Sequence, residues 1–452
     1  MKSYIIREHC ARILLIASQR VQRFQASKRG TEQSYAPTNP RWLHKMKSSK
    51  PTIVMLTPDR QIDRRILLST DSLEAAGWDV TIIAMPLDEP AIEERRVVRI
   101  GSNAGTVNRE SRVLDAYRWV RGHLPMNGRL MRWMKRLAWR YLVDQESFYF
   151  KLFYSTASQY APRVFVANDL PMLPVASQLA QKCGAKLVYD SHELYSEQEF
   201  SEREKRRWAE IEAKYIGACD VVITVNQSIA TELEHRYGVS GVRVIYNAER
   251  TQNRPLVSRR FHETFGLSAE KKILLLQGGL SAGRNLEVLV DAMRYAQNLS
   301  LVLVVLGDGL LLNTLQQLVQ QQDLVGRVYF HAAVPQNELL ALTAAADAGV
   351  IPYQATCLNN RYCTPNKLFE FIALGLPVLA TDLPEIRRFV EGQQIGLVGD
   401  TGSPRKLAAL IDDFFSDDYR FATWKANVAV ARQQICWELE GKKLVEIYEA
   451  LR

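Results

Sequence analysis

The chain has 452 residues, enough for two or three domains, because most domains contain about 100–200 residues. Apolar residues make up 47% and charged residues 24%, as in globular proteins, which argues against long disordered stretches and fibrous repeats. The formal charge of +9 comes entirely from residues 1–50, which hold eleven basic and two acidic residues, so the rest of the chain is neutral overall. A nucleic-acid-binding protein usually carries its basic excess on the folded body, and we therefore expect no nucleic-acid partner.

The six cysteines are spread along the chain without a C-x-x-C pair. This pattern predicts neither a disulfide framework nor a zinc site, and it favours a reducing, cytoplasmic setting. No apolar run approaches the ~20 residues of a transmembrane helix. The N-terminal apolar stretch is interrupted by charged residues, unlike a signal peptide. We therefore expect a cytoplasmic protein that does not span the membrane.

Residues 1–50 form a basic N-terminal extension ahead of the first predicted strand. As a helix, this extension has one apolar stripe among arginines, formed by Ile6, Cys10, Ile13, Ala17, Val21 and Phe24. A basic insertion, residues 103–150, repeats the composition and adds tryptophans. Because basic amphipathic helices with Trp lie in membrane interfaces, we expect peripheral, salt-sensitive contact with an anionic cytoplasmic leaflet. The alternative is that both stripes pack on the protein and the arginines are solvated.

Short apolar runs alternate with stretches of helical spacing from residue 51 onward. The predicted strands are 53–56, 80–84, 164–167, 186–190 and 221–225, and the predicted helices are 66–76, 172–182 and 202–217. Apolar runs without polar alternation are typical of parallel strands covered on both faces. The succession of strand and helix predicts a doubly wound, Rossmann-like α/β domain over residues 51–248.

The polar stretch of residues 249–270 is predicted to be a linker, and the α/β pattern restarts after it. Further strands are predicted at 273–276, 301–306, 328–330, 348–352 and 377–381. Residues 271–418 are therefore predicted to form a second α/β domain. The last stretch, residues 419–452, is helical in period and is expected to contain no strand.

The segment 364–370 is the most informative in the second domain. Thr364 is a suitable N-cap and Pro365 suits the first helical position, so the helix is expected to begin after the strand 348–352. Its N-terminus would open at the carboxyl edge of the sheet, where Lys367 and the helix dipole favour a phosphate. Glu370, three residues further on, could accept hydrogen bonds from two ribose hydroxyls. The alternative is an ordinary solvated Lys–Glu pair.

Two glycine-containing turns follow other strands of this domain. Gly278 and Gly279 would let a ligand approach the backbone, and Arg284 could bind phosphate with two hydrogen bonds. The alternative is a simple turn with a solvated arginine. Gly307-Asp308-Gly309 resembles the start of a dinucleotide fingerprint, but Leu312 occupies the third glycine position, so this signal is weak.

His192 ends a strand of the first domain within Tyr189-Asp190-Ser191-His192-Glu193, where polar residues are well placed for catalysis. A structural role for this histidine is the alternative. The chain contains no H-E-x-x-H, no D-x-D and no G-x-x-x-x-G-K-[ST] motif. These absences argue against a zincin site, a carboxylate-held metal on a nucleotide and a phosphate-binding loop.

Taken together, six segments resemble the family 4 glycosyltransferases, retaining enzymes of the GT-B fold. They are residues 63–66, 189–194, 244–247, 277–284, 365–370 and 375–378, of which Pro-Asn-Lys-Leu-Phe-Glu is typical of one branch. The resemblance covers about residues 51–452. It implies two Rossmann-like domains that face each other across a cleft. The first would bind the acceptor and the second the sugar nucleotide, and the final helix would cross back to the first domain.

The resemblance also assigns roles to individual residues. Glu370 matches the glutamate that holds the ribose, and Arg284 matches the cation of the diphosphate clamp. His192 matches a histidine near the donor sugar. Lys367 and the amides around Asn366 match the helix start beside the phosphates.

Three positions depart from the family pattern. The first Glu of the E-x7-E motif falls at Tyr362, and Gly279 replaces the arginine common after the first glycine of the clamp loop. Residues 57–60 stand in place of a glycine-rich loop after the first strand. Lys367 is the residue we expect to supply the missing cation.

The leading hypothesis is a retaining, metal-independent glycosyltransferase of EC class 2.4. It would move a sugar from a nucleoside diphosphate sugar to a glycan or lipid-linked acceptor in cell-surface polysaccharide synthesis. Arg284, Lys367 and the helix dipole would neutralise the leaving diphosphate, with no cofactor. One alternative is a catalytically silent GT-B protein that binds partners in an assembly complex. The other is a GT-B sugar-nucleotide epimerase, which the basic insertion disfavours.

Overall fold

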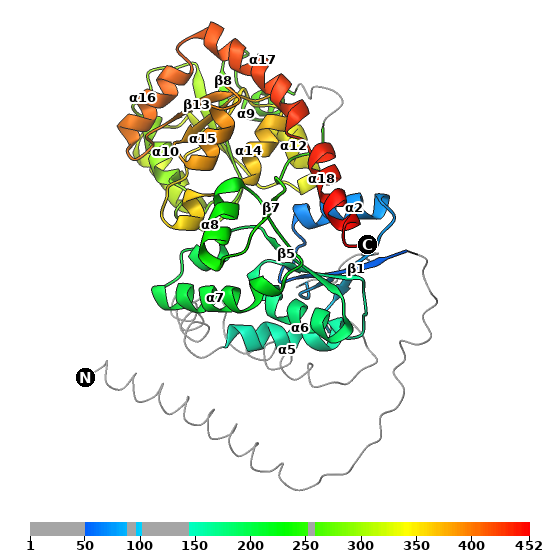
Figure 1. Cartoon of the computed structure of the whole chain (residues 1–452). Coiled ribbons are helices and arrows are strands. Elements are labelled where there is room, and N and C mark those ends of the chain that lie inside the picture. The colour runs from blue at the N-terminus through cyan, green and yellow to red at the C-terminus, as the bar shows by residue number, and fades with distance from the viewer. Residues whose placement is uncertain (1–49, 88–95, 102–143, 252–257) are drawn as a thin grey trace, which may run out of the picture. The chain divides into compact units, whose positions relative to one another are not determined.

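The computed structural model describes residues 50–87, 96–101, 144–251 and 258–452 (Figure 1). The extension 1–50, except for its last residue, and most of the basic insertion lie outside these ranges, and so do the stripes predicted in them. In the part of the chain that is described, every helix is too short or too polar to cross a bilayer.

The first domain is built on a seven-stranded sheet in the order β3-β2-β1-β4-β5-β6-β7, with all pairs parallel. Its strands are β1 (Thr52–Thr57), β2 (Asp79–Ala84), β3 (Val97–Arg99), β4 (Val164–Asn168), β5 (Lys186–Ser191), β6 (Val221–Thr224) and β7 (Arg243–Val244). The five predicted strands are confirmed. β3 and β7 were not predicted, because with three and two residues they are too short to show a pattern.

Helices cover both faces of this sheet. They are α2 (Arg64–Ala75), α5 (Gln145–Ala157), α6 (Leu173–Cys183), α7 (Glu202–Tyr215) and α8 (Gln227–Tyr237), with short 3-10 turns η2 (Leu170–Met172), η3 (Tyr195–Glu197) and η4 (Ile216–Ala218). A capping box between Ser201 and Glu204 starts α7, which satisfies free amides of its first turn. Because α5 begins at Gln145, the end of the predicted insertion 103–150 belongs to a helix of the domain.

The second domain has a six-stranded parallel sheet in the order β10-β9-β8-β11-β12-β13. Its strands are β8 (Lys272–Gln277), β9 (Leu301–Leu306), β10 (Val328–His331), β11 (Ala348–Ile351), β12 (Val378–Thr381) and β13 (Gly396–Gly399). Its helices are α9 (Arg260–Phe265), α10 (Leu286–Ala292), α11 (Leu312–Gln321), α12 (Gln336–Thr343), α13 (Leu358–Arg361), α14 (Asn366–Ala373), α15 (Pro384–Val390) and α16 (Pro404–Phe414). All five predicted strands are confirmed, and β13 was missed.

The strands lack polar alternation because both faces of each sheet are covered. Every residue of β9 is buried. Val302 and Val304 belong to the core cluster on one face, whereas Leu303 and Val305 belong to the cluster on the other. Alternate side chains of one strand therefore supply two separate cores, as the period of two requires.

Helix α9 lies inside the segment 249–270, which the sequence analysis described as a linker. Phe261 of this helix is fully buried in the second domain, and its ring meets that of His331 at 6.0 Å between centroids. Residues 260–265 are thus part of the second domain. Their polar composition hid a short helix with a single buried face.

The two C-terminal helices, α17 (Asp418–Gln434) and α18 (Trp437–Glu449), connect the domains, and no strand follows them, as predicted. Helix α17 buries Trp424 in the second domain. Helix α18 lies beside α2 of the first domain (Figure 1), where the Trp437 indole donates to Ser72 Oγ at 2.9 Å. The rings of Trp78 and Tyr448 pack edge to face at 6.3 Å. The predicted crossing of the chain back to the first domain is confirmed.

The turn Gly307-Asp308-Gly309 after β9 has a structural role. Gly307 has a φ of +152°, and a Cβ atom there would lie 2.0 Å from the Gly278 carbonyl oxygen. Glycine is therefore required for the loops after β8 and β9 to approach each other. The partial dinucleotide fingerprint is explained by this contact.

Candidate functional site

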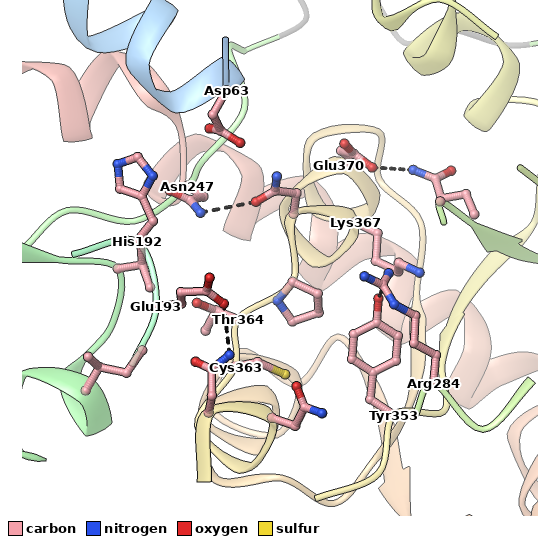
Figure 2. A pocket seen from close by; sticks show the side chains of 18 of the residues that line it. Asp63, His192, Glu193, Asn247, Arg284, Tyr353, Cys363, Thr364, Lys367 and Glu370 are labelled. Atoms are coloured by element: carbon pink, nitrogen blue, oxygen red, sulfur yellow. Dashed lines mark hydrogen bonds between the residues drawn. The ribbon is translucent and has the colours of Figure 1, made fainter. Parts of the chain in front are cut away.

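A cavity of about 630 Å³ opens between the two domains, at the carboxyl ends of both sheets. Five of the residues singled out in the sequence line it, together with Gly278: His192, Arg284, Asn366, Lys367 and Glu370 (Figure 2). Gly279 is exposed next to the cavity and does not line it. The structure thus brings six of the seven predicted residues together.

Helix α14 begins one residue later than the sequence analysis predicted. Pro365 is its N-cap, with ψ at 142°, and its carbonyl oxygen accepts from the amide of Leu368 at 2.9 Å. The prediction that Thr364 caps this helix is wrong. The Thr364 hydroxyl instead accepts a hydrogen bond from Asn226 Nδ2 at 3.2 Å, on the side of the first domain. The first free amides of α14 are those of Asn366 and Lys367, both at the cavity.

Two cations of the second domain converge on Tyr353. The Arg284 guanidinium donates to the Tyr353 hydroxyl at 2.7 Å, and Lys367 Nζ lies 4.9 Å from the centre of the same ring. Gly278 has a φ of +109°, and a Cβ atom there would lie 3.5 Å from Lys367 Nζ. Tyr353 was not predicted, because the sequence offers only one indication of a role in the site, its position just after β11.

Lys367 is 6% exposed, and among the described residues neither it nor Arg284 forms an ion pair with a carboxylate. A buried ammonium group without a counter-ion is costly. The alternative of a solvated Lys–Glu pair on α14 is therefore wrong, because Lys367 and Glu370 are both buried and unpaired with each other. This wall of the cavity is suited to an anion.

Glu370 is held by a short chain of hydrogen bonds. Thr343 Oγ1 donates to Gln277 Oε1 at 2.7 Å, and Gln277 Nε2 donates to Glu370 Oε2. Burial raises the pKa of this carboxyl, although the bond from Gln277 opposes the shift. Glu370 Oε2 is thus oriented by its neighbours, while the other oxygen remains to accept from a ligand hydroxyl. Thr343 was not identified from the sequence, and Gln277 was noted only as the first residue of the segment 277–284.

Replacing Glu370 by Gln should weaken the binding of a nucleoside diphosphate about five- to tenfold. A charged acceptor of hydrogen bonds becomes a neutral one, and a bond to a charged group is worth about 1 kcal/mol more. Isothermal titration with UDP, GDP and ADP measures the change. Glu287→Gln, on the exposed side of α10, is the matched control. Unchanged affinity in Glu370→Gln would place this carboxylate outside the nucleotide site.

The opposite wall, from the first domain, is centred on His192. His192 Nδ1 lies 3.4 Å from Asp169 Oδ2, and Nε2 lies 3.6 Å from Asp190 Oδ2. Burial by itself lowers the pKa of His192, but the two carboxylates outweigh it and raise the pKa to about 9. The two carboxylates therefore favour the imidazolium form of the ring. Asp169, which the sequence analysis missed, has a positive φ of 63°, an uncommon backbone conformation for a residue with a side chain.

His192→Gln should reduce stability more at low pH than at high pH. Because the pKa of about 9 lies above that of a free histidine, ~6.5, the contribution is complete below ~6.5 and is lost as pH rises through about 9. The difference between these two pKa values corresponds to about 3 kcal/mol of folding stability. Urea unfolding of both proteins at about pH 6 and about pH 9.5 tests this. If the free energies of unfolding of the wild type and of His192→Gln differ by the same amount at both pH values, the charge assignment is contradicted.

A buried ion pair links three of the segments noted in the sequence. Arg65 makes two bonds to Asp190, of 2.9 and 3.2 Å, and also donates to the Ile245 carbonyl at 2.7 Å and to Asn247 Oδ1 at 2.9 Å. Burial opposes ionisation of Asp190, yet Arg65 and His192 hold its pKa well below the usual range. Asn247 Nδ2 in turn donates to Asn366 Oδ1 at 3.1 Å (Figure 2). Arg65 thus positions both His192's partner and a contact to α14.

Helix α13 docks onto the first domain. Asn359 accepts from the Leu194 amide and donates to Glu193 Oε2, each at 2.9 Å. Asn226 donates to the Tyr362 carbonyl at 2.7 Å, and the Tyr362 ring packs on the core of the first domain. The residue at the expected first-Glu position is therefore turned away from the cavity, and Glu193 is the carboxylate that reaches the cavity near α13.

Two parallel Rossmann-like sheets that face a shared cleft, with a last helix that crosses back, define the GT-B class of proteins. Comparison with known families agrees. The family model described as "Glycosyltransferase Family 4" matches residues 63–251. The family model described as "Glycosyl transferases group 1" matches residues 257–429. The two matches cover the two domains in order and support a GT-B glycosyltransferase.

Individual relatives are distant. A chitobiosyldiphosphodolichol beta-mannosyltransferase of Candida albicans is 24% identical over 211 residues, 43% of this chain and 46% of the relative. The matches span between 41% and 62% of the curated relatives, so the chain spans about half of their length.

Solved structures share the fold over nearly their full length. A sucrose-phosphate synthase from Thermosynechococcus elongatus has a TM-score of 0.67 at 18% identity, covering 89% of this chain and 99% of that one. HepE of Anabaena, solved with UDP and glucose, has a TM-score of 0.63 at 18% identity and covers 88% and 100%. At these identities the likeness concerns the fold.

Proposed function

We propose that the protein transfers a sugar from a nucleoside diphosphate sugar to a glycan or lipid-linked acceptor in cell-surface polysaccharide synthesis. The observation that carries this proposal is Lys367, a buried cation beside Arg284 with no carboxylate partner among the described residues. A diphosphate is the anion that both cations and the first amides of α14 would neutralise together. In support, HepE was solved in complex with UDP and with UDP-glucose, and the Candida relative is named a chitobiosyldiphosphodolichol beta-mannosyltransferase.

The chemistry follows from the two walls. As the bond between the anomeric carbon and the diphosphate breaks, negative charge grows on the leaving oxygen, and Arg284, Lys367 and the α14 dipole stabilise it. Glu370 holds the ribose. His192 lies beside the donor sugar, where Asp169 and Asp190 favour its protonated form, so we do not assign it the role of a base. In the retaining mechanism, the acceptor hydroxyl attacks on the face from which the diphosphate departs, and the leaving phosphate takes its proton.

Activity is expected to survive a chelator. We assign charge neutralisation to Arg284, Lys367 and the N-terminus of α14, which need no divalent ion. Transfer rates measured with and without EDTA, after removal of bound metals, should agree within about twofold if these groups supply the main electrostatic stabilisation. Restoration of a lost activity by Mg²⁺ or Mn²⁺ would contradict the assignment.

A panel of sugar nucleotides tests the activity against its alternatives. Release of the nucleoside diphosphate, with a new glycoside of unchanged anomeric configuration, supports a retaining transferase. An isomerised donor would indicate an epimerase. No reaction with any of the donors would indicate a binding protein without catalytic activity. Retention of the clamp residues at the cavity disfavours the last alternative, because a silent protein need not keep them.

Peripheral attachment to the cytoplasmic face of the membrane is part of the proposal. It rests on the apolar stripe and surrounding arginines of residues 1–50 and on the similar composition of residues 103–150, most of which lie outside the described residues. Flotation with anionic liposomes at low and high salt tests it, with a chain that starts at Pro51 for comparison. Full-length protein that stays unbound at low salt, or that only detergent releases, would contradict it.

A further inference from the structure

The two walls of the cavity carry opposite charge. Arg284 and Lys367 lie on the side of the second domain. The side of the first domain presents four carboxylates to the same cavity, those of Asp59, Asp63, Asp169 and Glu193. Asp63 and Glu193 are seen in Figure 2 on the opposite side of the cavity from Arg284. The polarity of the cleft therefore changes sign from the donor side to the acceptor side.

The cations of the first-domain wall are already occupied. His192, the one cation among the described first-domain residues that line the cavity, lies between Asp169 and Asp190. Behind it, Arg65 is paired with Asp190. Arg64 is paired with the buried Glu249. Among the described residues, each of these three cations is thus paired with a carboxylate.

Three of the four carboxylates accept hydrogen bonds from neutral groups, although His192 also attracts Asp59 and Glu193, and Arg64 attracts Asp63. Asp59 accepts from the Thr57 hydroxyl at 2.9 Å. Asp63 caps α2 and accepts from the Arg65 amide at 2.7 Å. Glu193 accepts from the side-chain amides of Asn359 and Gln198. Their negative charges therefore act on whatever enters this side of the cavity.

These charges also act on one another. Burial raises the pKa of Asp59, with a further contribution from Asp63, and burial likewise raises the pKa of Glu193, to which Asp59 adds. A ligand anion placed among them would meet the same repulsion. Sugar hydroxyls, in contrast, donate to carboxylates, and such charge-assisted bonds are the stronger kind.

We propose that the accepting sugar in this cleft carries no negative charge, neither phosphate nor carboxylate, and that Asp59, Asp63 and Glu193 select it. This inference rests on the proposed function. It concerns only the sugar that receives the transfer, so a lipid diphosphate farther along the acceptor is compatible with it.

Paired acceptors that differ by one charge test the inference. The probes are p-nitrophenyl glucoside against glucuronide and galactoside against galacturonide, with the donor found in the panel above. We expect kcat/KM to favour the uncharged member at least about tenfold, because like charges brought together cost several kcal/mol. Saturation-transfer NMR with UDP-saturated protein makes the same comparison without turnover.

Variants identify the source of the preference. The ratio of kcat/KM for the uncharged acceptor to kcat/KM for its uronide should fall to within about threefold of unity in the double variant Asp59→Asn with Glu193→Gln. The single variant Asp63→Asn keeps the helix cap and should also lower this ratio. The control Glu263→Gln removes an exposed charge on α9 and should leave the ratio unchanged. UDP affinity and thermal midpoint show that each variant is folded.

Two results would overturn the inference while the proposed function stands. One is a uronide that is accepted or bound as well as its parent. The other is the absence of binding by every uncharged glycoside although UDP binds. If the wild-type protein binds no nucleoside diphosphate and consumes no donor, the proposed function itself fails.

Discussion

Arg284→Ala and Lys367→Ala are each expected to lower kcat about 10²–10³-fold, the effect of removing one preorganised donor from a developing negative charge. Both cations lie around Tyr353 in fixed positions, with Lys367 almost completely buried. They need not reorganise when the diphosphate departs. The loss should therefore appear mainly in kcat, with a smaller change in KM for the donor.

Steady-state rates with the best donor, checked by single-turnover measurements, separate the two constants. Arg405→Ala is a suitable control, because this arginine also lies over a tyrosine ring, that of Tyr295, but outside the cavity. Near-wild-type turnover in either cavity variant would show that the clamp is wrongly assigned. Arg284→Lys adds a test of geometry, since lysine keeps the charge but loses the planar pair of donors.

Arg65→Met should destabilise the protein by about 3–5 kcal/mol, the cost of leaving one buried charge without its partner. Arg65 is 3% exposed and Asp190 is 4% exposed, so water cannot replace the lost bonds. The carbonyl of Ile245 and the side chain of Asn247 lose a donor as well. We also expect a fall in activity, because Asp190 helps to hold His192.

Urea unfolding at neutral pH measures the loss. Lys406→Met is the control, since its pair with Asp400 is more than half exposed on both sides and should be worth less than about 1 kcal/mol. Combining Arg65→Met with Asp190→Asn removes both charges and should recover part of the stability. If Arg65→Met alone unfolds at the same urea concentration as the wild type, the pair does not hold these segments together.

The local sequence predicted most of the fold for a simple reason. Ten strands were predicted from apolar runs, most of them buried on both faces, and such a pattern does not depend on the rest of the structure. The strands that were missed, β3, β7 and β13, lie at the edges of the sheets and are short or only half buried. Helix α9 was missed because a six-residue helix with one buried phenylalanine leaves no periodic signal.

The residues around the cavity also fall into two groups, those that local sequence could identify and those that only the folded structure could. Gly278, Arg284, Asn366, Lys367 and Glu370 could be identified one by one, because each stands just after a strand or at the start of a helix, where α/β domains bind ligands. Their residue types and neighbours in the chain already indicated a phosphate and a ribose. Chain order alone also placed His192 at a strand end.

Only the tertiary structure decided what surrounds them. Asp169, Tyr353 and Gln277 touch their partners across separations of 23 to 93 residues, and no local pattern encodes such pairs. The burial that leaves Lys367 without a counter-ion and the carboxylates that charge His192 likewise arise when distant segments meet. The sequence by itself therefore predicted two α/β domains and candidate residues for a phosphate and a ribose. The folded chain decided the sign of charge on each wall, because electrostatic energy depends on distances in space.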